Sequence, residues 1–479
     1  MAEKSERSRY FLSPDRIRQS TQAGRNLIEE TLSDHARVVT CTAFRRLQTK
    51  AQVFSLETNA AVRTRLTHTL EVAMFGELIA GKVFDNLVSS GTAEENLRLP
   101  FTKTVSNACL LHDIGNPPFG HLGEYAIQKW IADNEQSLCS SWKKQGVAQE
   151  HVARFLPGFK YFDGNAQGFR IVSRLQWLSD SSGLNLTASL LASMVKYLTP
   201  TPATTKNRLG FRGKVGYFES ESKTLEQIWK RLGLKWDANA GLPGQRHPLV
   251  FLMEAADDIA YCLSDIEDAL EKRIVSEEAF KKALDRTTRR KHWKKLDSKK
   301  RHCKYAEFVV FRTNLTRHLV NRAAEIFCEQ HDAILDGELQ HPLLDLDKES
   351  SAALDGLKQF ARKNIFVSAE AVGVELSGFQ IVTGLLDALS PLLSLASMDF
   401  RALLERKRSG KKPSEFALES RLVELLSRKH ALAFLDCVDA EPDLEPIFRL
   451  QLLLDYVSGM TDSHAVKTYH VVRGFPSVR

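Results

Sequence analysis

Apolar residues recur three and four positions apart through most of this chain, and this spacing constrains its fold more than any other feature. The pattern begins near residue 43 and persists to about residue 460. Alternation typical of strands is scarce, and the best site for a hairpin is residues 209–220. The spacing therefore predicts an all-α protein with a large helical fold, rather than a four-helix bundle, and at most one short β-hairpin.

Three stretches depart from the helical pattern. Residues 1–37 are polar and Arg-rich, and we expect an arm that lies over the surface. Residues 131–168, rich in Gly, Gln and Asn, predict a loop or small insertion, and residues 286–304 carry ten Lys or Arg in nineteen positions. We divide the rest into a helical core, 38–275, and a helical C-terminal region, 276–479.

Composition excludes several classes of protein. No uncharged apolar run approaches the ~18 residues of a membrane span, and the polar N-terminus lacks the apolar core of a signal peptide. The seven cysteines are scattered without a C-x-x-C pair, which favours a reducing, cytoplasmic setting and argues against a cysteine zinc site. The net charge of +7, from 66 basic against 59 acidic residues, permits a polyanionic ligand without requiring one.

One apolar helical run ends abruptly on an ionisable pair. His112 and Asp113 close the run that begins near Val105, and Gly115 to Pro118 break the helix at once. Burying such a pair without a partner is costly, so a metal cation is a good candidate for that partner. Neighbours on a helix point about 100° apart, so an adjacent pair can hold one metal only at a helix end, where this pair lies.

Two further apolar helices supply ligand types, with His68 on the first and Asp257 and Asp258 on the second. Two histidines and two carboxylates form a nitrogen and oxygen site that suits Mn²⁺, Fe²⁺, Mg²⁺ or Zn²⁺. Each residue alone has an ordinary reading: a structural histidine, or a carboxylate that caps a helix or faces solvent. The set as a whole favours a metal site, because every ligand lies within an apolar helix.

The order His, His-Asp, Asp resembles the HD superfamily of metal-dependent phosphohydrolases. Longer blocks, among them CLLHDIGNPPFGHLGE, FDGNAQGFR and EAADDIAYCLSDIEDALEKRI, resemble the bacterial deoxyguanosinetriphosphate triphosphohydrolases over about residues 38–465. The departures are the basic 286–304 stretch and extra residues near 409–416. The resemblance implies an HD-type core at 38–275, with 276–479 completing the base pocket and the oligomer contacts.

The resemblance also implies a role for individual residues. The metal ligands are His68, His112, Asp113 and Asp257. Asp257 is preferred to Asp258 because Asp257, Tyr261 and Asp265 recur every four residues and share one helix face. His121 and Glu124, three apart, form the catalytic pair, in which Glu124 orients His121 as a general acid. The implied reaction is water attack at the α-phosphate, which releases deoxynucleoside and intact triphosphate.

Binding residues follow from the same resemblance. The phosphate groups are expected to meet Arg65, Asn116, Lys196, Tyr197, Lys214 and Arg408. The sugar is expected to meet Gln52, Tyr261 and Asp265, with Tyr261 excluding a 2′-hydroxyl. The guanine is expected to meet Val53, Phe366 and Glu375, since a carboxylate accepts from the N1–H and 2-amino donors. Any one of the cations could equally be a surface charge, and Phe366 could be an ordinary core aromatic.

The resemblance implies further partners: Mg²⁺ or Mn²⁺, with other first-row metals possible, a homohexamer, and single-stranded DNA as an effector. The basic 286–304 stretch, with Trp293 as a stacking aromatic, suits single-stranded DNA, although a solvated loop is the common reading of such a run. We therefore predict a dGTP or dNTP triphosphohydrolase that controls dNTP pools. The alternatives are an HD phosphohydrolase of broader or different nucleotide specificity, and a nucleic-acid-binding regulatory protein.

Overall fold

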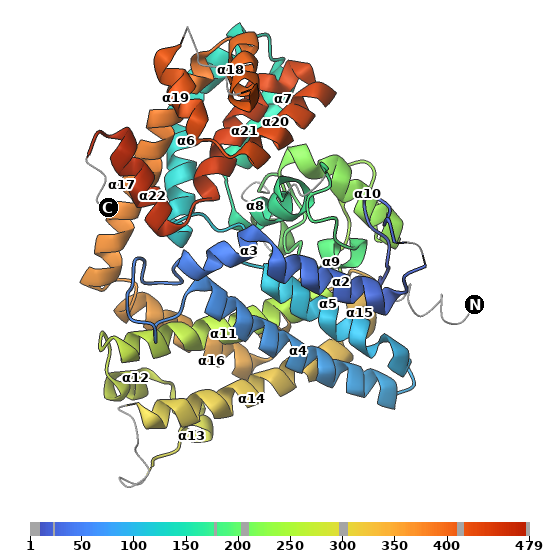
Figure 1. Ribbon diagram of the computed structural model, residues 1–479. Coiled ribbons are helices and arrows are strands. Elements are labelled where there is room, and N and C mark those ends of the chain that lie inside the picture. The colour runs from blue at the N-terminus through green and yellow to red at the C-terminus, as the bar shows by residue number, and fades with distance from the viewer. Residues whose placement is uncertain are drawn as a thin grey trace.

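The computed structural model describes residues 10–22, 24–176, 180–202, 210–296, 305–409 and 416–475, and these residues are mainly helical (Figure 1). The helices are α2 (Leu27–Thr40), α3 (Thr42–Arg46), α4 (Arg65–Ser89), α5 (Arg98–Leu111), α6 (Gly120–Lys144), α7 (Gln149–Lys160), α8 (Gly164–Arg170), α9 (Ala188–Ser193), α10 (Ser222–Leu232), α11 (Leu249–Glu271), α12 (Glu277–Ala283), α13 (Arg286–His292), α14 (Ala306–Glu329), α15 (His331–Leu335), α16 (Lys348–Asn364), α17 (Ala369–Leu389), α18 (Ser397–Ser409), α19 (Ala417–Leu425), α20 (Arg428–Ala440), α21 (Glu445–Ser458) and α22 (Asp462–Val472). The predicted all-α class is confirmed.

A single short hairpin is present in the described residues, but its predicted place was wrong. Strands β1 (Trp236–Asp237) and β2 (Leu242–Pro243) pair antiparallel. At the expected place, Gly210–Arg212 forms a 3₁₀ turn. The Phe211 carbonyl accepts from the Leu198 N–H, and the Gly216 N–H donates to the Thr199 carbonyl, both at 2.9 Å. This segment therefore pairs with residues 198–199 and not with itself.

The lower lobe in Figure 1 is built around α4, α5, α11 and α14, which pack against one another. The N-terminal segment contributes to this lobe, although we expected it to lie over the surface. Tyr10 and Leu12 are buried in its core. The Arg16 guanidinium is also buried, and it pairs with Glu30 and with Asp34, the latter at 2.6 Å. These ion pairs explain how a polar arm can pack inside the protein.

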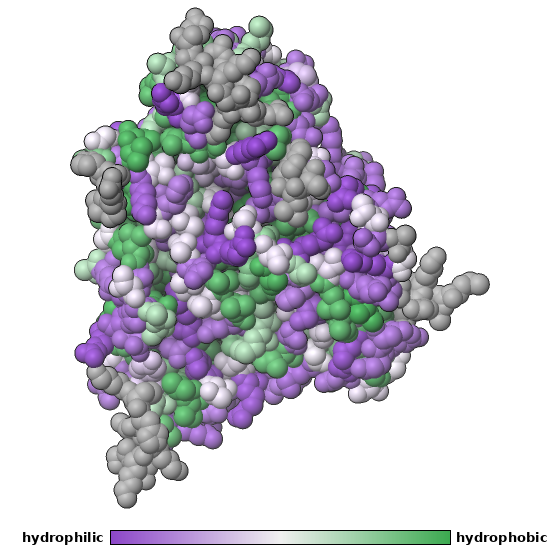
Figure 2. Space-filling model, in the orientation of Figure 1, coloured by the Kyte–Doolittle hydropathy of each residue, from purple (hydrophilic) through white to green (hydrophobic). Residues whose placement is uncertain are grey.

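The upper lobe has a second hydrophobic core, in which α6 and α7 pack with the C-terminal helices α17 to α22. Residues 131–168 are therefore not a loop or insertion, because most of them lie in α6, α7 and α8. Apolar residues such as Trp130, Ile131, Leu138 and Trp142 carry the buried face of α6. The polar residues that suggested a loop occupy its outer face, and Figure 2 shows how polar side chains dominate the visible surface.

The residues 112–119, between α5 and α6, join the two lobes. Gly115 packs so closely that a Cβ there would lie 2.0 Å from the Gly164 carbonyl oxygen. At the far end Phe119 adopts a left-handed conformation with φ of 63°, and its N–H donates to Asp462 at 3.1 Å. Asp462 also accepts from the Ala51 N–H at 3.1 Å. The loop is thus fixed by α8 on one side and by α22 on the other.

One apolar helical stretch, Ala369–Ser394, is long and apolar enough by composition to cross a bilayer. It comprises α17 and the 3₁₀ segment Ser390–Ser394. Its inner face, which includes Gly378, Val382 and Leu385, is buried against α6, α21 and α22. Of the apolar window in this stretch, 39% is buried inside the protein, and its outer face remains exposed.

Candidate metal centre and nucleotide site

Three helices of the lower lobe bring His68, His112 and Asp257 together. One ligand atom from each lies within 4.8 Å of the others. Both imidazole Nε2 atoms lie 3.5 Å from Asp257 Oδ1. A capping box between Thr64 and Thr67 starts α4 just before His68, and His112 is the residue on which α5 ends. Three of the four predicted metal ligands thus converge.

The two imidazoles are prepared to accept a cation. His112 Nδ1 lies 2.7 Å from the Cys109 carbonyl oxygen, so it carries the proton and leaves the Nε2 lone pair free. His112 Nε2 is buried and has no hydrogen-bond partner among the described residues. The Asp257 side chain keeps 28% exposure, so the cluster can be reached from solvent. Neutral imidazole nitrogen and carboxylate oxygen are ligands that a divalent first-row metal accepts, so the residues fit such an ion.

Asp113 lies at the edge of this cluster rather than inside it. Its Oδ1 is 3.6 Å from His112 Nε2 and accepts from Asn116 Nδ2 at 2.5 Å, while its Oδ2 pairs with Arg65 at 2.6 Å. Burial alone would raise the pKa of this carboxyl, but Arg65 and the two imidazoles outweigh burial and lower the pKa to about 2. Asp113 is therefore a carboxylate at neutral pH, available as a fourth ligand.

The contacts of Asp257 and Asp258 on α11 are consistent with the preference for Asp257 as a metal ligand. Asp257 faces both histidines, and although burial opposes ionisation, those histidines hold its pKa well below the usual range. Asp258 instead pairs with Lys358 of α16 at 3.0 Å. That pair links two helices, as expected of a structural carboxylate.

Two lysines flank a tyrosine beside the cluster. Lys196 pairs with Glu254 at 3.3 Å, and Lys214 lies 3.6 Å from Asp163. Both ammonium groups lie 5.9 Å from the centre of the Tyr197 ring. Arg65 pairs with Asp113, and Lys196 is close enough to Asp257 to lower its pKa, so both bring positive charge beside the metal cluster, as a polyphosphate requires.

His121 and Glu124, the predicted catalytic pair, do not contact each other in the way we expected. The described contacts include no hydrogen bond or ion pair between them. Glu124 is buried, and its Oε1 accepts from the Gly164 N–H at 2.7 Å. His121 is exposed at the start of α6. Spacing placed both on one helix face, but α8 packs over that face and takes Glu124 as its partner.

The surroundings of His121 and Glu124 favour the neutral form of each side chain. Burial, and after it the carboxylate of Asp163, raise the pKa of Glu124 to about 8. Surrounding protein atoms lower the pKa of His121, and the cations Arg65 and Lys214 lower it further. An anion bound beside these cations would offset their effect on His121.

The predicted sugar residues include buried oxygens without partners. Asp265 is 1% exposed, and neither carboxylate oxygen has a hydrogen-bond partner in the described chain. Gln52 Oε1 is likewise buried and unpaired. An isolated bridge between Ala51 and Thr64 holds the segment with Gln52 against the start of α4. Tyr261 lies one turn from Asp265 on α11 and is partly buried.

The predicted base-binding residues are less clearly assembled. Val53 and Phe366 are half-buried at the edge of the lower core. Glu375 is exposed on α17, and partial desolvation by neighbouring atoms raises the pKa of its carboxyl above the ordinary value. The described contacts do not join Glu375 to the metal cluster. The Arg408 side chain lies outside the described residues, so its predicted role stays untested.

The predicted stacking role of Trp293 is wrong. Trp293 is 9% exposed, and its ring packs against Phe280 and Phe311 in the lower core. Its indole N–H donates to Glu307 at 2.9 Å. The aromatic residue that suggested nucleic-acid stacking is thus a core residue. Residues 297–304 of the basic stretch lie outside the described part of the chain.

Several supporting residues escaped the sequence reasoning. Lys50 is buried, which lowers its pKa to about 7, and its ammonium donates to the carbonyls of Asn116 and Ser458. Glu254 and Asp163 each hold one of the two lysines beside Tyr197. Glu254 could have been recognised, because it lies three residues before Asp257 on α11. Lys50 could not, since its partners are backbone atoms distant in sequence.

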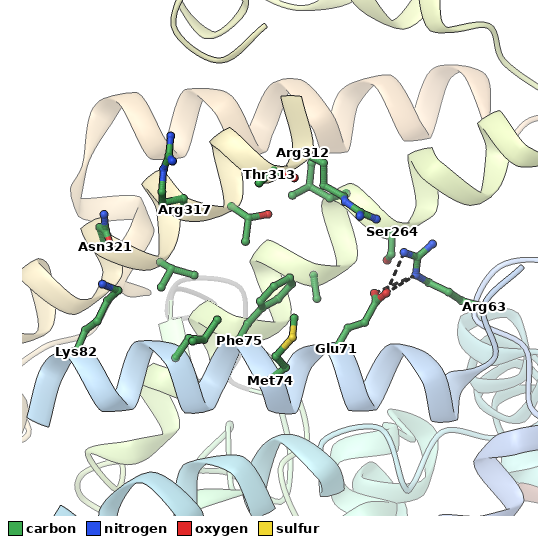
Figure 3. A pocket seen from close by; sticks show the side chains of 15 residues that line it. Arg63, Glu71, Met74, Phe75, Lys82, Ser264, Arg312, Thr313, Arg317 and Asn321 are labelled. Atoms are coloured by element: carbon green, nitrogen blue, oxygen red, sulfur yellow. Dashed lines mark hydrogen bonds and ion pairs between the residues drawn. The ribbon is translucent and has the colours of Figure 1, made fainter. Parts of the chain in front are cut away.

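A separate pocket of about 440 Å³ lies between α4, α11 and α14 (Figure 3). Its apolar floor includes Met74 and Phe75, and Lys82, Arg312 and Arg317 stand around it. None of the clustered metal ligands lines this pocket. It is therefore distinct from the metal centre.

Comparison with known proteins accords with the geometry. The family model of the HD domain matches residues 65–151, which contain His68, His112 and Asp113. The chain is 35% identical to a deoxyguanosinetriphosphate triphosphohydrolase of Klebsiella pneumoniae (strain 342), over 96% of both chains. It is 36% identical to proteins of that name from Salmonella typhi and Salmonella typhimurium, over 91% of this chain and 92% of theirs. Identity of this extent shows that the chain belongs to the deoxyguanosinetriphosphate triphosphohydrolase family of HD-domain hydrolases.

Proposed function

We propose that this protein hydrolyses dGTP to deoxyguanosine and inorganic triphosphate. The observation that carries the proposal is on α11. One face of this helix presents Asp257 to the imidazoles of His68 and His112 and, eight residues later, the Asp265 carboxylate, which has no hydrogen-bond partner among the described residues. A metal-binding end and a hydroxyl acceptor on one rigid helix suit a substrate with a phosphate at one end and a sugar hydroxyl beyond it.

The proposed metal ligands are His68, His112, Asp113 and Asp257, with Mg²⁺ or Mn²⁺ as the ion. A divalent ion bound there would polarise the α-phosphate and lower the pKa of a bound water. His112 and Asp113 would hold the ion in fixed orientations, because the Cys109 carbonyl sets the His112 tautomer and Arg65 and Asn116 hold the Asp113 carboxylate.

The chain's own groups would position the triphosphate. Arg65, Lys196 and Lys214 supply cations around the cluster, and Asn116 and Tyr197 supply polar groups beside them. We assign the Arg408 position to the same task from the family resemblance. Preorganised cations stabilise the charge that develops in the transition state, since they need not reorient during reaction.

His121 is the proposed general acid for the departing 5′-oxygen. Its lowered pKa makes it neutral in the free enzyme at neutral pH. A bound triphosphate brings several negative charges next to it, and these favour the imidazolium form. Substrate binding would thus protonate the acid that the reaction needs. Glu124 supports the site through Gly164 and not through direct contact with His121.

Sugar and base selection rest on the remaining residues. Asp265 and Gln52 would bind the 3′-hydroxyl, and Tyr261 would occupy the space of a 2′-hydroxyl. Val53, Phe366 and Glu375 would line the guanine pocket, with Glu375 moving inward to accept its donors. A site built to hydrogen-bond one base rejects another because buried polar groups are then left unpaired.

The proposal includes a cellular compartment, an oligomeric state and an effector. Six cysteines of the described residues are free, which suits a cytoplasmic enzyme that controls dNTP pools. Exposed apolar residues such as Val367 and Leu376, at 62% and 65% exposure, suit a homo-oligomer, and we propose a hexamer by family resemblance. Single-stranded DNA is the proposed effector, with the basic residues of 286–304 as its contacts.

A substrate panel tests the proposal. Purified enzyme is incubated with each dNTP and with GTP in Mg²⁺ and in Mn²⁺, and products are separated by anion-exchange chromatography. Deoxyguanosine and triphosphate from dGTP, with little product from GTP, are expected. His112→Ala should abolish turnover, whereas Asp258→Asn should retain it. Equal turnover of all dNTPs would refute the guanine pocket, and turnover by His112→Ala would refute the metal assignment.

A further inference from the structure

A second group of metal-ligating side chains lies in the lower lobe, on elements that carry none of the proposed catalytic residues. His292 ends α13, His318 lies in the middle of α14, and Glu349 lies in the first turn of α16. One ligand atom from each lies within 4.8 Å of the others. The two imidazole rings have their centres 5.1 Å apart.

Two polar atoms of this group lack partners in the described residues. His318 Nε2 and Glu349 Oε1 are both buried and without a hydrogen bond. His292, beside them, is 7% exposed, and its side chain forms no described hydrogen bond. Leaving a buried donor or acceptor unpaired costs about 1–3 kcal/mol, so two such atoms at one place call for a ligand.

The surroundings orient these atoms toward one point. Lys291 binds the other oxygen of the same carboxylate, Glu349 Oε2, at 2.5 Å and so leaves Oε1 as the free atom. Asn314, one turn before His318 on α14, donates to the His292 carbonyl at 3.1 Å. That bond fixes the end of α13 beside His318. The three ligands thus come from three separately anchored elements.

We propose that His292, His318 and Glu349 form a second metal site, which binds Zn²⁺ with a water as fourth ligand and joins three elements of the lower lobe. Two imidazoles and one carboxylate are a known zinc donor set, with bonds of about 2.0–2.2 Å. The ligand atoms of a tetrahedral zinc site lie about 3.3 Å apart. Side-chain movements of about 1 Å would bring the three ligand atoms to that spacing. The ion fastens α13, the start of the basic 286–304 stretch, to α14 and α16.

The site explains how a basic helix stays packed on the lobe. The last turn of α13 carries Arg289, Arg290 and Lys291 beside His292. Mutual repulsion of such cations favours detachment of the helix. Coordination by two other helices opposes it, because metal binding to the folded state alone adds to folding stability. Placement of this stretch then depends on zinc rather than on the catalytic ion.

Zinc stoichiometry tests the proposal. Full-length protein is stripped with a chelator, reloaded with ZnCl₂, desalted and analysed by inductively coupled plasma mass spectrometry. The His318→Ala and Glu349→Gln variants should each hold about one zinc ion per chain fewer than the wild type. His341→Ala, which removes an exposed histidine eight residues before Glu349 in the sequence, is the matched control and should hold as much as the wild type.

A second readout separates a lost site from a misfolded variant. Zinc should raise the thermal unfolding temperature of wild type and His341→Ala further than that of Glu349→Gln, a nearly isosteric change that still accepts from Lys291. Mg²⁺-dependent turnover of dGTP should persist in Glu349→Gln, so failure of the proposed function would be visible separately. Equal zinc content in wild type, His318→Ala and Glu349→Gln would overturn the proposal, as would loss of all bound zinc in His112→Ala alone.

Discussion

Replacing Asp265 by Asn should make the protein more stable and less active at once. Asp265 is buried on α11 with both oxygens unpaired in the described residues. Burial, and after it the Asp268 carboxylate, raise its pKa well above the ordinary value. At neutral pH the unfolded chain ionises this group freely, whereas the folded chain must bury either a charge or an unpaired acid. The wild-type fold therefore carries a cost that a ligand hydroxyl would relieve.

The magnitude follows from the raised pKa, because the amide of Asn is as short of partners as the acid but does not titrate. Asp265→Asn should therefore raise the free energy of unfolding at pH 7 by about 1.4 kcal/mol for each pKa unit by which the folded state raises the Asp265 pKa. Because the folded-state pKa is the raised one, the gain should shrink as the pH falls toward the unfolded value near 4. A hydrogen bond from a substrate hydroxyl to the carboxylate is worth about 1.5–3 kcal/mol, so kcat/KM for dGTP should fall about 10- to 150-fold.

Differential scanning fluorimetry of chelator-treated protein measures the change in stability, and steady-state kinetics measures the change in kcat/KM. Asp268→Asn is the matched control, three residues further along the same helix and equally buried. Asp268 is paired with Arg63 at 2.6 Å, so its removal should destabilise the protein and leave kcat/KM nearly unchanged. Lower stability and intact turnover in Asp265→Asn, as expected for Asp268→Asn, would contradict this prediction.

Three further predictions concern the scaffold. Gly115→Ala places a Cβ 2.0 Å from the Gly164 carbonyl oxygen, so it should destabilise the protein by about 1–3 kcal/mol and weaken metal binding, measurable by unfolding and by calorimetric titration with Mn²⁺. Arg170→Met removes the buried partner of Asp455 and Glu221, at 2.7 and 2.6 Å, and should cost about 3–5 kcal/mol in chemical denaturation; an unchanged midpoint would contradict this. Burial lowers the pKa of His247 to about 4, below the unfolded value of 6.5, so its contribution should be complete above pH 6.5 and fade as the pH falls toward 4. The His247→Gln variant should show a shallower loss of stability over that pH range, and an identical pH profile would count against the assignment.

Patterns local in sequence predicted most of the helices, and they located on those helices the three side chains that the structure brings together as a possible metal site. Apolar spacing defined the helices that carry His68 and Asp257, and the Gly-Pro break located the end of α5 at His112. Four-residue spacing placed Asp265 on the same helix as Asp257. Each of these inferences depended on one helix at a time, where geometry is nearly fixed.

The errors arose where tertiary contacts decide the outcome. Glu124 lies on the predicted helix face but accepts from Gly164, a partner forty residues away. The polar stretch 131–168 is helical because only its inner face must be apolar to pack on the C-terminal helices. Trp293 stood among cations in sequence but packs on Phe280 and Phe311. No local pattern encodes which side of a segment another element will cover.

Incorporation of oxygen from labelled water shows which bond of dGTP the enzyme breaks. Enzyme, dGTP and the divalent ion are incubated in H₂¹⁸O, and the products are analysed by mass spectrometry and phosphorus NMR. Attack of water at the α-phosphorus predicts one ¹⁸O in the triphosphate, at its newly formed terminal phosphate, and none in deoxyguanosine. Label in the deoxyguanosine 5′-hydroxyl, or nucleotide with pyrophosphate as the products, would contradict the proposed reaction.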